Sequence, residues 1–129
     1  MTTDYRMLDR VPGQRLMALR ACDIERIEEY DSDPELSYLD PDADPDCAAQ
    51  NAERLGAYRA GAWHCIAIKA RATFLIGLGE AAVIQVVESP GLWGIESDSD
   101  PGYLDAVFRE EAETLRHMLA QLNVTVVDA

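Results

Sequence analysis

Two rows of alternating carboxylates are the residues of this 129-residue chain whose type and spacing could do chemistry. The first row is Asp40, Asp42, Asp44 and Asp46, and the second is Glu96, Asp98 and Asp100. Carboxylate oxygens are the ligands that calcium and magnesium prefer, and a pair of carboxylates can act as general acid and general base. Each row therefore raises the question of a metal site or a catalytic site.

The first row resembles the beginning of a calcium-binding loop of the D-x-D-x-D-G type. Counted from Asp40, the position that needs a glycine is Pro45, and the position that needs a bidentate glutamate is Asn51. The turn and the strongest ligand are both missing, so we expect no calcium site. If the segment is extended, its alternate carboxylates lie on one side about 6.6 Å apart and could imitate a phosphate backbone. The alternative is a solvated loop that serves only solubility.

The second row directly precedes a predicted helix that starts at Pro101. Acids at this place offset the helix macrodipole and satisfy free N–H groups, which favours a capping role. Three alternating carboxylates could also bind a divalent ion or perform acid–base catalysis, but no histidine lies near them in sequence. We therefore predict structural capping and keep a metal-dependent enzyme as the less favoured hypothesis.

Other catalytic signals are missing. The histidines and cysteines lie far apart, without C-x-x-C or G-x-S-x-G spacing; they are His64, His117, Cys22, Cys47 and Cys65. The segment 77–79 has two glycines but no third glycine or following helix, so it predicts a turn and not a phosphate-binding loop. We expect a non-enzymatic protein without a cofactor.

Acidity is the unusual property of the composition. The formal net charge is −13, and 11 of the 24 acidic residues fall within residues 23–46, where Arg26 is the only base. Such a surface repels nucleic acid and anionic membranes and attracts a basic protein. The residues that we assign to partner binding are Glu28, Glu29, Asp31, Asp33, Glu35, Asp40, Asp42, Asp44, Asp46, Trp93, Glu96, Asp98 and Asp100.

Trp93 is the aromatic member of this set and lies next to glycine in the segment 91–94. An exposed tryptophan often anchors a protein partner. A tryptophan in a glycine-rich loop can equally fill the core beneath that loop, and we favour this core position. The three unpaired cysteines, the lack of a leader and the lack of a long apolar run predict a soluble cytoplasmic protein.

The elements that must position these residues predict one α+β domain over residues 1–129. Residues 63–76 and 82–88 alternate as the two strands of an antiparallel hairpin, 63–88, whose core face carries the even-numbered residues from His64 to Phe74. Apolar spacing predicts a helix at 101–122 and a shorter one at 46–60. We also expect an N-terminal arm at 1–13, an acidic extended loop at 31–47 and a short strand after Asn123. Residues 16–30 fit helical and extended patterns about equally, and we favour a strand at 23–30.

Several segments together resemble a family of small acidic proteins from bacteriophages, prophages and other mobile elements. They are residues 58–68, 84–86, 89–100 (SPGLWGIESDSD), 103–104 and 115–122, and the similarity covers roughly 50–122. Family members commonly carry the motif S-x-G-L-W-G-I-E-S-D-S. Ala67 stands where the family usually has glycine, and Lys69 where it usually has arginine. The resemblance implies a mobile-element setting and no particular activity.

Setting and charge together predict an inhibitor of host defence, of the anti-CRISPR or anti-restriction kind, in a bacterial cytoplasm. It would act as a DNA mimic on a basic, nucleic-acid-binding host protein without binding nucleic acid itself. The alternative is a structural or regulatory interaction module of the element, which could be a homodimer.

Overall fold

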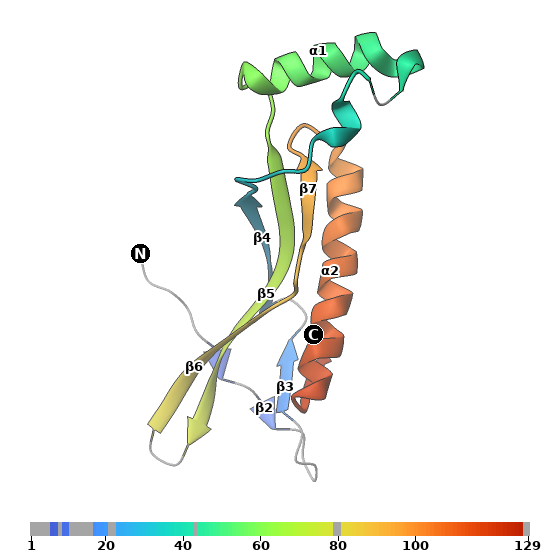
Figure 1. Cartoon of the computed structure of the whole chain (residues 1–129). Coiled ribbons are helices and arrows are strands. Elements are labelled where there is room, and N and C mark those ends of the chain that lie inside the picture. Colours follow the sequence, from blue (N-terminus) through green and yellow to red (C-terminus); the bar gives the residue numbers. More distant parts are fainter. Residues whose placement is uncertain are drawn as a thin grey trace.

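The long strand β5 (Cys65–Leu78) is the central element of the fold, because every other strand of the larger sheet pairs with it. The computed structural model describes residues 6–7, 9–10, 17–20, 23–42, 44–78 and 81–127, with side chains described at 20, 23–42, 44–75 and 83–127. Figure 1 shows the sheet with helix α2 (Pro101–Gln121) along its length and helix α1 (Ala48–Arg59) across one end. The predicted α+β class is confirmed.

The predicted hairpin is formed by β5 and β6 (Ala81–Glu88), which pair antiparallel from Arg71 opposite Glu88 to Leu78 opposite Ala81. Because Gly77 is still inside β5, the reversal comes later than the glycine pattern predicted. Gly79, the other glycine of that prediction, lies outside the described residues.

Two further strands flank β5. Strand β4 (Ile24–Tyr30) pairs antiparallel with Ile66 to Ala72, which confirms the strand predicted at 23–30. Strand β7 (Leu92–Glu96) pairs with the first residues of β5 across an irregularity between Ile66 and Ile68. No clear strand signal marks β7 in the sequence, because its five residues follow Pro90 and Gly91 and include Gly94, which leaves no room for a clear alternation.

The N-terminal strands and the C-terminal tail complete the sheets. Strand β1 (Arg6–Met7) pairs parallel with β5, and β2 (Asp9–Arg10), β3 (Met17–Arg20) and β8 (Val124–Val127) form a second sheet. The strand predicted after Asn123 is thus confirmed. Of the arm predicted at 1–13, the described residues 6–7 and 9–10 form strands, and the others lie outside the described part.

The core lies between β5 and α2. Alternate β5 residues are buried against Val107, Leu115 and Leu119 of the helix, as the predicted alternation requires; they are Ile66, Ile68, Ala70, Ala72 and Phe74. His64, which the pattern placed on the same face, lies before the strand and is exposed.

The opposite face of β5 is buried at the start of the strand and partly exposed at Lys69 and Arg71. Trp63, Cys65 and Ala67 are buried, and Leu39 and the apolar side of α1 pack against Trp63 and Cys65. A second core therefore stabilises the end of the sheet where the acidic loop is attached. Sequence periodicity could not reveal it, since its members come from three separate segments.

The acidic loop at 31–47 connects β4 to α1 but is not extended throughout. One-turn 3₁₀ helices at Ser37–Leu39 (η2) and Pro45–Cys47 (η3) interrupt it. Asp44 caps the second of these by accepting a hydrogen bond from the amide of Asp46. Prolines forbid a regular helix here, as predicted, yet they favour short turns as readily as an extended chain.

Candidate functional site

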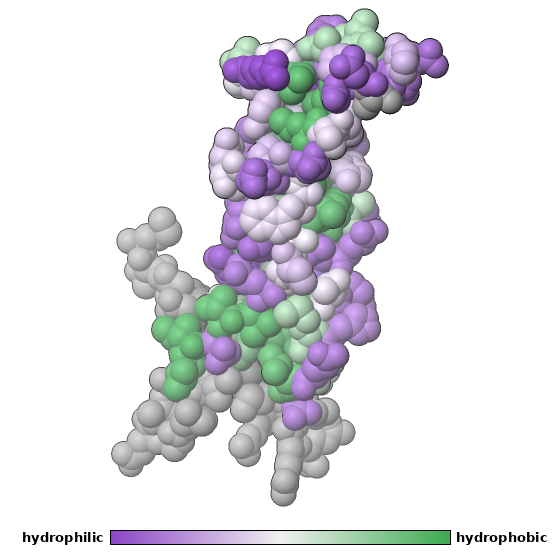
Figure 2. Space-filling model, in the orientation of Figure 1, coloured by the Kyte–Doolittle hydropathy of each residue, from purple (hydrophilic) through white to green (hydrophobic). Residues whose placement is uncertain are grey.

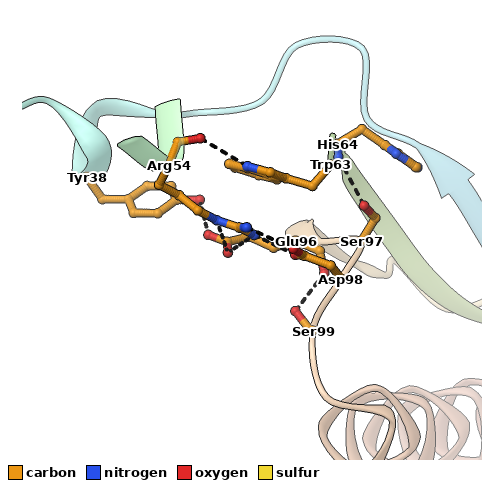
Figure 3. Close-up of polar contacts among 8 residues, drawn as sticks. All are labelled: Tyr38, Arg54, Trp63, His64, Glu96, Ser97, Asp98 and Ser99. Atoms are coloured by element: carbon orange, nitrogen blue, oxygen red, sulfur yellow. Dashed lines mark hydrogen bonds and ion pairs between the residues drawn. The ribbon is translucent and has the colours of Figure 1, made fainter. Parts of the chain in front are cut away.

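Arg54 lies at the centre of a polar cluster that joins α1 to the end of β7 (Figure 3). Its Nη2 donates to Glu96 Oε1 at 2.6 Å, and its Nη1 donates to Asp98 Oδ2 at 2.8 Å. Nε donates to the same Glu96 oxygen at 3.2 Å, and Nη2 also reaches Asp98 Oδ1. One guanidinium thus holds two carboxylates of the second acidic row.

Trp63 packs beneath this guanidinium. The Cζ atom of Arg54 lies 4.0 Å from the centroid of the tryptophan ring, within cation–π distance. The indole Nε1 donates to the backbone oxygen of Arg54 at 3.0 Å, and the ring of Tyr58 lies tilted against the indole with centroids 5.1 Å apart. Trp63 is 2 % exposed, so it fixes α1 to the start of β5.

Tyr38 adds the acidic loop to the cluster. Its hydroxyl donates to Glu96 Oε2 at 2.7 Å, so Glu96 bonds to Arg54 through one oxygen and to Tyr38 through the other. Burial and then the hydrogen bond to Glu96 raise the pKa of Tyr38 above its ordinary value, so the phenol stays a neutral donor. The loop, α1, β5 and the end of β7 meet at one point.

The charges of this cluster are mutually supported. Hydrogen bonds from Arg54 hold the pKa of Asp98 below its ordinary value, and Asp98 in turn raises the pKa of Arg54. The turn that carries the acids is held by Ser97, whose Oγ accepts from the amide of His64 at 3.0 Å, and by Ser99, whose Oγ donates to the Glu96 carbonyl at 2.6 Å. The cluster is a fixed ion-pair network.

This network bears on the hypothesis of a metal or catalytic site at the second acidic row. Glu96 and Asp98 bond to Arg54, and Asp100 instead caps α2 by accepting a hydrogen bond from the amide of Gly102 at 3.1 Å. The described residues hold no group of three His, Cys, Asp or Glu side chains that could ligate a metal ion. Capping, the role we predicted for this row, is observed for Asp100.

The first acidic row forms consecutive turns instead of a straight ladder. Asp40 Oδ1 accepts from the amide of Asp42 at 2.9 Å, and Asp44 Oδ1 accepts from the amide of Asp46 at 3.1 Å. The alternation that suggested a phosphate-like spacing therefore reflects side chains that bond the backbone two residues on. All four aspartates remain exposed to solvent.

Other predicted residues gather at a hollow between the acidic loop and β7. It has a volume of about 540 Å³ and is lined by Asp31, Asp33, Glu35, Tyr38, Trp93 and Gly94. We call it the acid–aromatic pocket. Trp93 is 46 % exposed here, which corrects the prediction that it fills the core. Its indole Nε1 donates to the carbonyl of Pro90 at 3.2 Å, a bond that orients the ring.

Two of the three glutamates of β4 are engaged in internal ion pairs. Glu28 binds Arg26 at 2.9 Å, and Glu29 binds Lys69 at 3.2 Å. Lys69 in turn lies 5.1 Å from the centroid of the Trp93 ring. The structure thus divides the predicted site residues among internal ion pairs, the cap of α2, the exposed loop from 33 to 46, and the acid–aromatic pocket.

Arg54 is the residue that sequence reasoning missed. One signal was present, since residues 27–53 contain no Lys or Arg and Arg54 is the first cation after that stretch. Its partners are 42 and 44 residues away in sequence, so spacing alone could not identify them.

Comparisons of the chain with protein-family models, with curated proteins and with solved structures found no match. Within the described residues, no helix combines the length and the apolar character that crossing a membrane requires.

Proposed function

We propose that this chain is a non-enzymatic, mobile-element-encoded inhibitor that binds a basic, nucleic-acid-binding host protein in place of DNA. The observation that carries the proposal is the loop from 33 to 46, which has six exposed carboxylates and no base. They are Asp33, Glu35, Asp40, Asp42, Asp44 and Asp46. An anionic surface of this kind speeds the encounter with a basic protein and favours it over other partners.

The loop is supported in a way that suits binding. Tyr38 connects it to Glu96, Leu39 is buried beneath it, and the side chains of Asp40 and Asp44 hold its turns. A surface that is ordered before binding loses less conformational entropy when the complex forms. The carboxylates therefore present a defined charge pattern, which supports a partner-specific role over simple solubility.

The test neutralises charge without breaking the turns. In the double variant Asp42→Asn, Asp46→Asn, two exposed loop charges are lost while Asp40 and Asp44 keep their hydrogen bonds. The control Glu110→Gln, Glu113→Gln removes two exposed charges from α2. The assay measures plating of a phage on bacteria that carry a restriction or CRISPR system and express each variant.

Wild type and control should restore plating, and the loop variant should restore it less. Host proteins that the wild type retains should be released by duplex DNA and by salt near 1 M, where the Debye length falls to about 3 Å. Equal protection by both variants, or retention that DNA does not affect, would contradict the proposal.

A second candidate function is a homodimeric interaction module of the mobile element. The observation in its favour is the apolar surface of β6. Val83, Ile84 and Val86 are exposed, and the strand carries no charged residue before Glu88. Figure 2 shows hydrophobic side chains gathered towards the lower end of the coloured surface, where β6 lies in Figure 1. Exposed apolar edge strands often pair with another chain. Light scattering that reports a 14.3 kDa particle at high concentration would reject the homodimer.

A further inference from the structure

We propose that the acid–aromatic pocket receives one arginine side chain of the basic partner. This inference rests on the proposed function and names the group that the partner would insert. Three carboxylates and two aromatic rings line the pocket, and none of its lining residues is basic. Of the common side chains, arginine combines a positive charge with a flat surface that stacks on aromatic rings and a fork of donors that matches a carboxylate.

Asp31 provides the strongest argument for a cationic occupant. It is 9 % exposed, and its Oδ1 accepts one hydrogen bond, from the amide of Asp33 at 3.2 Å. Within the described residues, its side chain has no ion pair and no second hydrogen bond. Since no fully buried side-chain oxygen of the described residues lacks a hydrogen-bond partner, the second oxygen of Asp31 keeps contact with solvent, and a cation there would pair with it. The pocket that Asp31 lines is the route by which a cation could reach its free oxygen.

The aromatic walls are exposed and held in place. Tyr38 is 49 % exposed while its hydroxyl is fixed by Glu96, and Trp93 is 46 % exposed while its indole is fixed by the Pro90 carbonyl. The Trp93 ring already attracts the ammonium of Lys69 at 5.1 Å. Two rings with fixed orientations can contact a guanidinium without first being ordered, and cation–π contact adds to the charge attraction.

The rim carries charge as well. Hydrogen bonds from Ser37, first from its side chain and then from its backbone amide, keep the pKa of Glu35 below the ordinary value. Glu35 is therefore ionised at neutral pH, and with Asp33 it makes the entrance of the pocket anionic. A bound guanidinium would face Asp31 inside and these two carboxylates outside.

The experiment titrates the whole chain with N-acetyl-arginine methylamide and follows the Trp93 indole N–H signal by NMR. The signal is assigned by its loss in Trp93→Phe. The matched probes are the lysine amide and the citrulline amide, which keeps the shape of arginine without its charge. Saturable movement should occur with arginine, be weaker with lysine and be absent with citrulline. No saturable movement up to about 100 mM arginine amide, or an equal response to citrulline, would overturn the proposal.

Variants separate binding from folding. Asp31→Asn keeps the oxygen that accepts from Asp33 and removes the buried charge, so it should weaken arginine binding about tenfold, equivalent to ~1.4 kcal/mol, and leave Tm unchanged or higher. A purely structural Asp31 would instead lower Tm without changing arginine affinity. Asp42→Asn, outside the pocket, should bind arginine normally.

The same variants distinguish the pocket from the function. If Asp31→Asn binds arginine as well as wild type while the loop variant still loses protection of the phage, the pocket assignment fails and the inhibitor proposal stands. If arginine binds as expected but the loop variant still protects the phage, the inhibitor proposal fails and the pocket stands.

Discussion

Arg54 and Trp63 hold each other through two contacts. The guanidinium lies 4.0 Å from the centroid of the indole ring, and the indole Nε1 donates to the Arg54 carbonyl at 3.0 Å. The ring covers one face of the guanidinium, and the N–H groups of the guanidinium donate hydrogen bonds to Glu96 and Asp98. This pair thereby connects α1 to the first residues of β5 and orders the base of the acidic loop.

Replacing Arg54 with alanine should lower the free energy of unfolding by about 1–2 kcal/mol, the sum expected for one cation–π contact and two part-exposed ion pairs. Arg54→Lys should recover only part of this, because an ammonium cannot bond two carboxylates in a planar fork. The control is Arg59→Ala, an exposed residue of the same helix, which should change stability by less than about 0.5 kcal/mol. Urea denaturation measures all three, and equal losses for Arg54→Ala and Arg59→Ala would show that the network is not stabilising.

Stability should fall in acid partly through Asp98. Its pKa is lower in the folded chain than the ordinary 3.8, so the unfolded chain binds more protons as the pH drops. The contribution is therefore complete above the ordinary pKa and is lost as pH falls through the lower, folded value. Denaturation of wild type and Asp98→Asn between about pH 6 and 2.5 should show a smaller acid loss in the variant.

The origin of that acid dependence is tested by a double-mutant cycle. Since Arg54 causes the shift, Arg54→Ala should reduce the acid loss as Asp98→Asn does, and the double variant should add little more. Fully additive effects would mean that the two side chains act independently.

Gly91→Ala should destabilise the chain more than Gly61→Ala. Both glycines have positive φ, +88° and +81°, so both variants carry the backbone strain of about 1–2 kcal/mol. At Gly91 a Cβ would also lie 2.7 Å from Lys69 Cγ and 3.3 Å from the Ile68 carbonyl oxygen, whereas Gly61 has open space. We expect a difference of at least about 1 kcal/mol in thermal unfolding. Equal losses of stability in the two variants would show that crowding against Lys69 and Ile68 adds nothing to the cost at Gly91.

Asp100→Ala should cost about 0.5–2 kcal/mol through loss of the cap on α2. Asp100→Asn should cost much less, because the amide oxygen can still accept from Gly102. Circular dichroism during thermal unfolding measures both variants. If the asparagine variant is as unstable as the alanine variant, negative charge at the helix start matters more than the hydrogen bond.

The sequence predicted the parts of the fold that depend on neighbours within one element. Alternation along β5 identified the face that α2 covers, and apolar spacing with Asp100 and Pro101 located that helix. The helix ends at Gln121, one residue before the predicted end at 122, and Asn123 follows with φ of 62°. These signals are local, since a strand repeats every two residues and a cap acts within one turn.

The sequence predicted the residues of the candidate site only in part. The acidic residues were found by composition, but their alternation suggested a straight row where the chain forms turns. Trp93 was assigned to the core, because an apolar residue beside glycines carries no signal that separates a buried ring from an exposed one.

The sequence by itself therefore determined the net charge of −13, the two helices, the central hairpin and the cap of α2. Only the tertiary structure decided which carboxylates are neutralised by Arg54 and which stay exposed, and that Asp31 and Trp93 line one pocket. The physical reason is the separation along the chain of the residues that interact. Propensity and periodicity act over a few residues, whereas an ion pair or a pocket depends on where chain reversals bring distant segments together.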